Sequence, residues 1–316
     1  MPQPIVTLTL NPAVDLACMA AAVTPTRKIR TFGEQLDAGG GGINVARVVH
    51  LLGGDVLALV ATGGVTGLLI EELLDEAGIA WQRLPISGRN RISVNVREES
   101  TGLEYRFVPQ GPTLELKDWR AALEALTTLD AEWVVASGSL PPGVPTDFYA
   151  EAATIMARKG LKFVLDTSGP ALLAMKQTEL ELLKLSLGEF EYLLGHAAPN
   201  LTAQKSELAQ LVNAGLAKKI AVTLGQNGAL LGTTNGIHHV PGIKVQQQGA
   251  VGAGDSFLAG LVLGFARGLT DLKALAFGNS AGASAVATYG TARIQRADVE
   301  ALYLDWCRAK HRWNGA

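Results

Sequence analysis

Short apolar runs alternate with longer helical patterns along this chain, and this alternation limits the possible fold more than any other feature. We interpret each apolar run as a buried strand. Strands that alternate with helices predict an α/β fold, in which helices cover both faces of a mainly parallel sheet. Ligands of such sheets bind beyond the carboxyl ends of the strands. The expected strands cover residues 5–10, 56–61, 133–137, 162–166, 182–185 and 220–224, and the expected helices lie near 43–52, 67–78, 115–128, 146–158, 203–217, 255–268, 271–288 and 297–310.

The composition fits one α/β domain over residues 1–316. Hydrophobic residues make up 48% of the chain and charged residues 18%, so a sizeable core can be buried. A net charge of -2 without a long basic block argues against a nucleic-acid binder. The two distant cysteines, Cys18 and Cys307, argue against a disulfide framework or a zinc site. We find no leader sequence and no membrane-spanning run, and therefore expect a cytoplasmic protein without membrane contact.

Two segments interrupt the alternation of strands and helices. Residues 13–37 mix polar and apolar side chains, and residues 89–108 contain two runs of alternating polarity separated by a Thr-Gly pair. The second pattern indicates a hairpin. We expect both segments to form a small β-sheet that projects from the main domain, either as a lid over an active site or as an edge hairpin with no role in function.

The turn at residues 249–255 places flexible backbone directly before a carboxylate. Gly252, Ala253 and Gly254 lead into Asp255 and an apolar helix. Unpaired N–H groups at a helix start, together with the helix dipole, form an anion site. A carboxylate there would repel phosphate, unless it acts as a base beside a transferring phosphoryl group. Asp255 is therefore either a catalytic base or a simple N-cap.

Three further stretches have the composition of ligand-binding loops. Four glycines at 39–42 precede a helix that carries Asn44 and Arg47, and they permit close approach of a polar ligand. The stretch "ASGSLPPGVP" at 136–145 follows a strand directly. The stretch "TLGQNGALL" at 223–231 has the pattern of strand, turn and strand, which suits a nucleotide pocket or a plain hairpin.

The order of these motifs resembles the ribokinase/PfkB family of sugar kinases. The stretches "GGGGINVAR", "GSLPPGVP", "TLGQNGA" and "VGAGDSF" occur in this order, and the resemblance covers nearly the whole chain. Together with "LTLNPAVD" at 8–15, they look most like the PfkB-type 6-phosphofructokinases. The resemblance implies a ribokinase-like three-layer αβα sandwich with a small β-sheet lid, and phosphorylation of fructose 6-phosphate by ATP. Kinases of fructose 1-phosphate or tagatose 6-phosphate are the alternatives.

The resemblance also implies roles for individual residues. Asp255 matches the general base, and the N–H groups of Gly252, Ala253 and Gly254 match its anion hole. On the acceptor side, the matching positions are Asp15, Gly40, Gly41, Asn44 and Ser139, with Lys28, Arg30 and Arg89 as cations for the substrate phosphate. On the nucleotide side, they are Lys184, Ser186, Thr223, Gly225 and Gly228, with Glu189 organising Mg²⁺. A bound K⁺ and a homodimer formed through the lid are implied in the same way. From the residues alone, the stretch around Lys28 and Arg30 equally suits a solvated strand face.

Two positions depart from the family pattern. The family usually has Lys-Pro-Asn-x-x-Glu where this chain has Lys184, Leu185, Ser186 and Glu189. Ala250 stands where many members carry a hydroxyl residue. We therefore expect retained activity with weaker apparent affinity for ATP or magnesium. A phosphosugar-binding protein with degraded catalysis is the alternative from another class. The role of Asp166 stays open between tuning the magnesium site through water and capping a turn.

Overall fold

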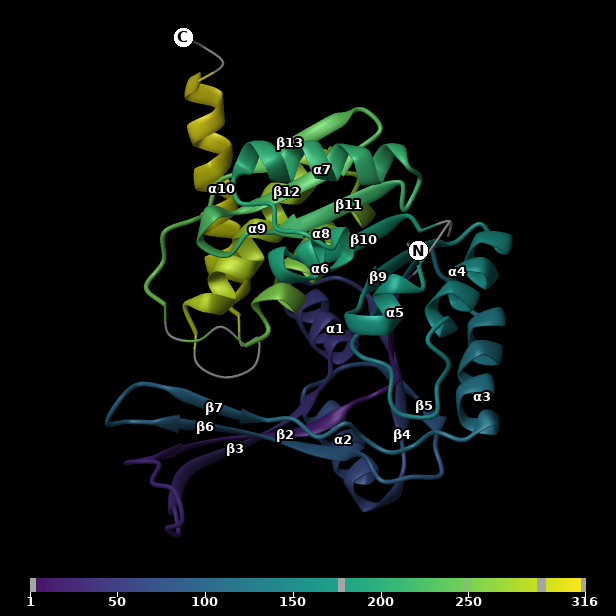
Figure 1. The fold of residues 1–316 in the computed structure, drawn as a ribbon, viewed down its shortest axis with the longest axis vertical. Coiled ribbons are helices and arrows are strands. Elements are labelled where there is room, and N and C mark those ends of the chain that lie inside the picture. The colour runs from purple at the N-terminus through teal and green to yellow at the C-terminus, as the bar shows by residue number, and fades with distance from the viewer. Residues whose placement is uncertain (1–3, 176–179, 248, 250, 289–293, 314–316) are drawn as a thin grey trace.

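A nine-stranded sheet forms the centre of the computed structural model, which describes residues 4–175, 180–247, 249, 251–288 and 294–313 (Figure 1). Its strand order is β13-β12-β11-β10-β9-β8-β1-β4-β5. All neighbouring pairs from β5 to β11 are parallel, and β12 and β13 are antiparallel. The strands are β1 (Ile5–Thr9), β4 (Val56–Thr62), β5 (Trp81–Pro85), β8 (Trp133–Ser137), β9 (Lys162–Asp166), β10 (Leu182–Ser186), β11 (Lys219–Thr223), β12 (Ala229–Thr233) and β13 (Gly236–Val240).

Helices cover both faces of this sheet and produce two separate apolar cores. The helices of one core are α1 (Gly41–Leu51), α2 (Gly64–Glu76), α8 (Ala253–Ala266), α9 (Asp271–Val286) and α10 (Arg296–Trp313). Those of the other core are α3 (Leu116–Thr127), α4 (Phe148–Arg158), α5 (Gly169–Leu173), α6 (Leu187–Leu194) and α7 (Leu201–Asn213). The chain thus forms the predicted three-layer αβα sandwich, because strands that are apolar on both faces need a helical layer on each.

Helix α8 packs closely against α9. Helix α8 is apolar all round, and every residue from Ser256 to Gly264 is buried. A Cβ atom at Gly260 would lie 3.0 Å from the Cα atom of Gly278, so only glycine permits this close helix contact. The helix that begins at the glycine turn is therefore anchored in the core along its length.

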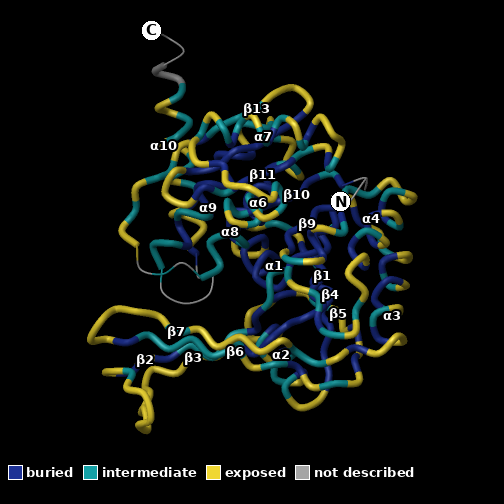
Figure 2. The backbone as a smooth tube through the Cα atoms, viewed as in Figure 1, coloured by how far each residue is buried: buried dark blue, intermediate teal, exposed yellow. Residues whose placement is uncertain are grey.

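A second sheet of four strands projects from the main body at the bottom of Figure 1. Its order is β3-β2-β6-β7, built from β2 (Ala13–Ala20), β3 (Thr31–Gly39), β6 (Arg91–Glu98) and β7 (Glu104–Phe107). This arrangement confirms that the two interrupting segments form one small sheet, with the expected hairpin between β6 and β7. Its outer strands are exposed to a greater extent than the main sheet (Figure 2).

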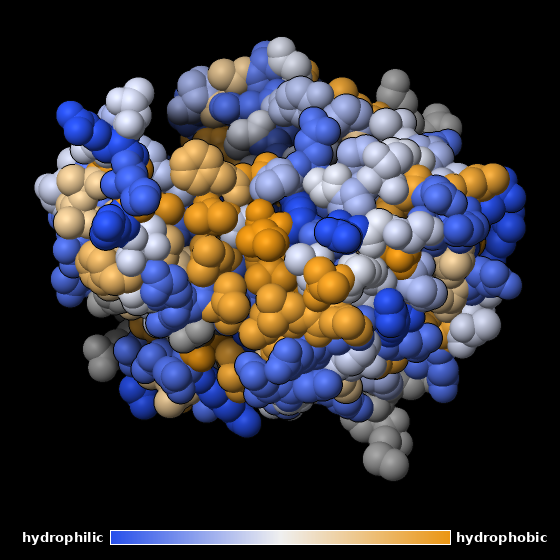
Figure 3. Space-filling model, turned by 90° about the horizontal axis from the view of Figure 1, so that it is seen from below, coloured by the Kyte–Doolittle hydropathy of each residue, from blue (hydrophilic) through white to orange (hydrophobic). Residues whose placement is uncertain are grey.

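The two faces of the small sheet differ in polarity. One row across its four strands consists of Leu36, Leu16, Val94 and Phe107, which are paired in register. Phe107 is 61% exposed, and apolar side chains gather on the lower face of the molecule (Figure 3). The positions between them carry polar side chains, such as Asp15 on β2 and its paired residue Ser93 on β6. The small sheet therefore has an apolar face and a polar face.

Four elements of the main body are missing from the sequence-based prediction. Helices α5 and α6 have only 5 and 8 residues, too few to show a helical period. Strands β5 and β13 lie at the two edges of the large sheet, where one face is exposed and the apolar run is broken. Among the described residues, no helix has the length and apolar composition needed to cross a membrane.

Candidate active site

A cavity of about 330 Å³ lies between the carboxyl ends of the central strands, the start of α8 and the small sheet. This is the edge at which parallel sheets bind their ligands. The cavity brings together predicted residues of the acceptor, catalytic and nucleotide sides. Those that line it are Asp15, Gly40, Gly41, Asn44, Ser139, Lys184, Glu189, Gly252 and Asp255.

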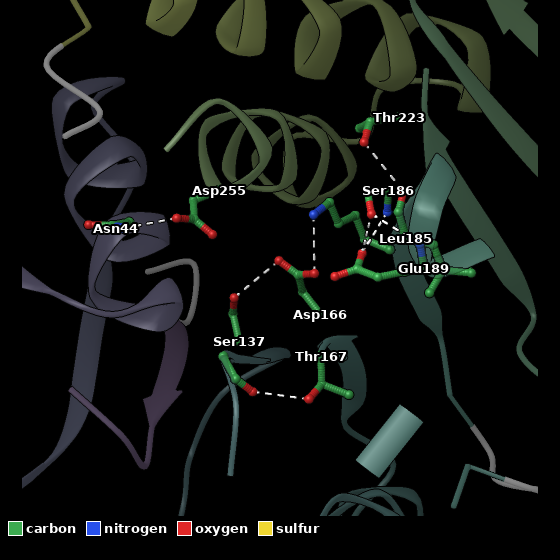
Figure 4. Close-up of polar contacts among 11 residues, drawn as sticks. Asn44, Ser137, Asp166, Thr167, Leu185, Ser186, Glu189, Thr223 and Asp255 are labelled. Atoms are coloured by element: carbon green, nitrogen blue, oxygen red, sulfur yellow. Dashed lines mark hydrogen bonds and ion pairs between the residues drawn. The ribbon is translucent and has the colours of Figure 1, made fainter. Parts of the chain in front are cut away.

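Asp255 lies in the first turn of α8 and does not cap the helix. The N-cap residue is Gly252, whose φ of 77° is in the left-handed region that favours glycine. One carboxylate oxygen of Asp255, Oδ2, accepts a hydrogen bond of 2.9 Å from Asn44 Nδ2 (Figure 4). The interpretation of Asp255 as a simple N-cap is therefore wrong, because its side chain points to α1 and not to the backbone of its own helix.

Burial gives Asp255 an unusual affinity for protons. Loss of solvation is the main cause that raises the pKa of Asp255 to about 6, and the neighbouring charge of Asp166 raises it further. The hydrogen bond from Asn44 and the charges of Lys184 and Arg47 act in the opposite direction. A carboxylate with a pKa near neutral pH is suited to general base catalysis, because it is ionised and still binds a proton usefully.

Arg47 holds Asn44 in place, a role that the sequence analysis missed. Arg47 Nη1 donates to Asn44 Oδ1 at 2.9 Å, and Arg47 Nη2 donates to the carbonyl of Ala38. With Oδ1 engaged, the amide of Asn44 can only present its NH₂ group to Asp255. The spacing of three residues on one helix face was the available signal.

The glycine loop is required by the side chains that pack against it. A Cβ atom at Gly41 would lie 2.2 Å from Ser137 Oγ, and one at Gly39 would lie 2.1 Å from Asp15 Oδ2. Gly40 has a φ of 122°, which other residues rarely adopt. Burial raises the pKa of Asp15, and nearby Arg91, Arg47 and Arg106 partly offset this increase. The loop therefore lets the backbone approach a ligand beside the half-buried carboxylate of Asp15.

The three predicted phosphate-binding cations lie outside this cavity. Lys28 and Arg30 are exposed on the connection between β2 and β3, and Arg89 is exposed beside Gly64. Two other arginines of the small sheet, Arg91 and Arg106, line the cavity instead. The assignment of Lys28, Arg30 and Arg89 to the substrate phosphate stays a prediction, and Arg91, the first residue of β6, is a cation that the sequence analysis did not single out.

A buried chain of polar groups connects β8, β9 and β10 beneath the start of α8. Lys184 Nζ lies 3.1 Å from Asp166 Oδ1, and Ser137 Oγ donates to Asp166 Oδ2 at 3.2 Å (Figure 4). Burial lowers the pKa of Lys184, but Asp166, Asp255 and Glu189 together raise it above its usual value. A Cβ atom at Gly254 would lie 3.0 Å from Lys184 Nζ. Asp166 therefore orients a charged lysine toward the glycine turn.

Ser186 and Glu189 form a reciprocal capping box at the start of α6. Ser186 donates from its backbone N–H and from its hydroxyl to Glu189 Oε2, at 2.7 and 2.8 Å. The N–H of Glu189 donates to Ser186 Oγ at 3.3 Å. Ser186, which stands at the family's asparagine position, thus holds the Glu189 carboxylate at the edge of the cavity.

A second cavity of about 590 Å³ adjoins the same glycine turn from the other side. The predicted nucleotide-side residues Thr223, Gly225 and Gly228 line it, together with Ala253 and Gly254. Gly228 has a φ of 92°, and a Cβ atom there would lie 2.0 Å from the carbonyl oxygen of Val240. Ala250, the second departure from the family pattern, lies outside the described residues.

These residues fit a nucleoside triphosphate and a magnesium ion. The first-turn amides of α8 lie at the border of the two cavities close to the Lys184 ammonium, an arrangement suited to an anion. In the described part of the chain, no three His, Cys, Asp or Glu side chains form a metal cage. Mg²⁺ does not need one, because it commonly uses one or two carboxylates together with phosphates and water. Glu189 and Asp166 would supply those carboxylates.

Comparisons with known proteins give the family of this chain. Residues 8–297 match the family described as pfkB family carbohydrate kinase. The ATP-dependent 6-phosphofructokinase isozyme 2 of Mycobacterium tuberculosis is 40% identical over 301 residues, covering 95% of this chain and 88% of that protein. The same isozyme of Escherichia coli is 32% identical, with 95% and 97% covered. The crystal structure of Escherichia coli phosphofructokinase-2 with potassium superposes with a TM-score of 0.92 at 31% identity, covering 96% of this chain and 98% of that one. The chain therefore belongs to the pfkB family of carbohydrate kinases.

Proposed function

We propose that this protein is an ATP-dependent phosphosugar kinase that converts fructose 6-phosphate into fructose 1,6-bisphosphate. The observation that carries the proposal is Asp255, a half-buried carboxylate with a pKa of about 6, which Asn44 holds in the first cavity close to the glycine turn that borders the second. Relatives named 6-phosphofructokinase isozyme 2 support this choice of acceptor.

The proposed chemistry is in-line transfer of a phosphoryl group. Asp255 takes the proton of the acceptor hydroxyl as the oxygen attacks the γ-phosphate of ATP. Its Oδ2 atom is bound to Asn44, so Oδ1 is the oxygen that receives the proton. The N–H groups of Gly252, Ala253 and Gly254 and the ammonium of Lys184 stabilise the negative charge on the transferring group.

We propose Mg²⁺ as the metal and Glu189 as the residue that organises it. Magnesium bound to the nucleotide would neutralise phosphate charge. Ser186 would hold Glu189 for this purpose through the capping box. K⁺ is a further candidate cation, since the matched Escherichia coli phosphofructokinase-2 was crystallised with potassium. Ser139, Asp15, Gly40 and Gly41 would contact the sugar.

We propose that the small sheet is a lid and also the interface of a homodimer, within one kinase domain over residues 1–316. The apolar row that includes Leu36 and Phe107 would pack against a second copy. Leu36→Asp should convert a dimer into a monomer in light scattering. Leu304→Asp, at a 50% exposed leucine of α10, is the control and should leave the mass unchanged. A Leu36→Asp protein with unchanged mass would refute this interface.

Because ATP and sugar phosphates are intracellular metabolites, we place the protein in the cytoplasm.

Two alternatives have specific support. Tagatose-6-phosphate kinase of Staphylococcus epidermidis is 32% identical and 1-phosphofructokinase of Bacillus subtilis is 31% identical, so the acceptor could be another phosphosugar. A binding protein with degraded catalysis is disfavoured because Asp255, Lys184 and Asp166 form a connected polar centre. The predicted weakening of ATP or magnesium affinity by Ser186 stays a prediction.

The proposal is tested by ADP release with magnesium on fructose 6-phosphate, fructose 1-phosphate, tagatose 6-phosphate and unphosphorylated fructose, run in parallel. We expect the highest kcat/KM on fructose 6-phosphate. A preference for another phosphosugar would keep the mechanism and change the acceptor. No turnover on any sugar would refute the kinase proposal and favour the binding protein.

A further inference from the structure

The small sheet joins the main body through four chain segments, and two polar side chains connect several of them. The segments are residues 10–12, 40, 86–90 and 108–115. Arg91 is the first residue of β6 and follows the third of these segments. Asn11 lies in the first segment and is only 4% exposed. We call Arg91 and Asn11 the hinge clip.

Arg91 binds two segments at once. Its Nη2 group donates to the carbonyl oxygen of Asn11 at 2.9 Å, and its Nη1 group donates to that of Pro109 at 2.8 Å. The planar guanidinium can span two fixed carbonyl groups, which a lysine ammonium on a flexible stem cannot do with the same geometry. Arg91 thereby fixes the start of β6 against the segments on both sides of it.

Asn11 extends the connection to the main body. Its Nδ2 group donates to the carbonyl of Gln110 at 2.9 Å and to Ser139 Oγ at 3.3 Å. Ser139 follows β8 and lines the acceptor cavity. Two polar atoms of the clip, Arg91 Nε and Asn11 Oδ1, are buried and have no hydrogen-bond partner among the described residues.

The clip also lies beside the carboxylate of Asp15. Arg91 pairs in register with Ala13, two residues before Asp15 on the neighbouring strand β2, and both Arg91 and Asp15 line the cavity. The charged groups that act on Asp15 are Arg91 from β6, Arg47 from α1, Arg106 from β7 and Asp37 from β3. Arg91 thus acts on Asp15 in two ways, by its charge and by fixing the sheet on which Asp15 stands.

We propose that Arg91 is a positioning residue of the phosphoryl-transfer site, which holds the small sheet at its hinge so that Asp15 faces the acceptor. This inference rests on the proposed function for its acceptor. Loss of the clip should weaken acceptor binding and leave ATP binding intact, because the nucleotide-side cavity has no lining residue from the small sheet.

The test compares Arg91→Gln and Arg91→Lys with the wild type, and Arg308→Gln serves as a control because Arg308 is 72% exposed on α10. We expect Arg91→Gln to raise the acceptor KM by about tenfold, which equals about 1.4 kcal/mol, with an unchanged ATP KM. Without any substrate, amide hydrogen exchange should become faster in residues 13–20 of Arg91→Gln and stay unchanged in α8. Arg91→Lys keeps the charge but cannot bridge both carbonyls, so its exchange should resemble that of Arg91→Gln.

Several results would overturn the proposal. Unchanged exchange in Arg91→Gln would exclude the clip, and equal changes in both KM values would exclude a specific effect on the acceptor. Full recovery by Arg91→Lys would mean that charge alone matters. The exchange measurement needs no turnover, so a wild-type protein that is inactive on every sugar would refute the proposed function and leave the hinge result to be judged separately.

Discussion

Replacing Asn44 by alanine should shift the pH dependence of the reaction by a predictable amount. Asn44 Nδ2 donates a 2.9 Å hydrogen bond to Asp255 Oδ2, and this bond lowers the pKa of Asp255. A hydrogen bond to a charged group is worth about 1.5–3 kcal/mol. Since one pKa unit corresponds to about 1.36 kcal/mol, loss of this bond should raise the pKa by about 1–2 units. The expected pKa in Asn44→Ala is therefore about 7–8, compared with about 6 in the wild type.

The raised pKa in Asn44→Ala should reduce activity at low pH, because Asp255 is proposed to act as a base. Asp255 must be ionised to accept a proton, so activity is lost as pH falls through its pKa. At pH 7, a pKa of about 6 leaves roughly 90% of Asp255 ionised, and a pKa of about 7–8 leaves roughly 10–50%. Protonation alone should therefore reduce activity at pH 7 by about 2- to 10-fold, and this part of the loss should disappear near pH 9.

The assay is kcat/KM for the acceptor between pH 5 and 9, because this ratio reports the pKa of the free enzyme. A direct effect of Asn44 on acceptor binding would lower kcat/KM equally at every pH. The pH at which activity falls on the acid side would therefore still report the pKa of Asp255. Asn213→Ala, at an exposed asparagine of α7, should leave the limb in place. If the acid limb of Asn44→Ala stayed near pH 6 or moved lower, Asn44 would not control the ionisation of Asp255.

Three further predictions concern the same centre and its support. Asp255→Asn should lose about 10²- to 10⁴-fold in kcat with ATP affinity retained in calorimetry, and near-normal turnover would refute its role as base. Ser186→Asn should lower the magnesium concentration for half-maximal rate at fixed ATP, and an unchanged value would contradict the expected weakness of this position. Gly42→Ala should cost about 1–3 kcal/mol in thermal or denaturant unfolding, because the added Cβ would lie 2.4 Å from Thr9 Oγ1. Gly188→Ala adds a Cβ with no neighbour within 4 Å, so a comparable loss there would show that packing is not the cause.

The buried strands and the long helices could be predicted because their apolar runs are strong local signals. All five residues of β8 are buried, and its sequence "WVVAS" shows this directly. Helix α6 has 8 residues and could not be found in this way. Its Ser-x-x-Glu capping box at Ser186 and Glu189 was the one local signal for its start.

Site residues that belong to one continuous sequence motif could be predicted, whereas residues that only folding brings together could not. The glycine turn before Asp255 is continuous in sequence, and the structure places Gly252 at the first cavity and Ala253 and Gly254 at the second. Arg91 was not singled out because no motif marks it: it is the first residue of β6 and lines the cavity, whereas Arg89 precedes the strand. The roles of Arg47 and Asp166 depend on contacts made only in the folded chain, such as the ion pair between Asp166 and Lys184.

The hydrogen bond between Asn44 and Asp255 has a consequence for the synthesis of this protein. The two residues are 211 positions apart, so the ribosome adds the second about 10–40 s after the first, at typical rates of 5–20 residues per second. By the end of this interval, the growing chain carries the glycine loop and all nine strands of the large sheet but still lacks Asp255, the proposed base. The nascent protein therefore cannot transfer phosphate until α8 has been made and has packed against α1. Activity should appear late in translation and all at once, and truncated chains that end before α8 should not consume ATP.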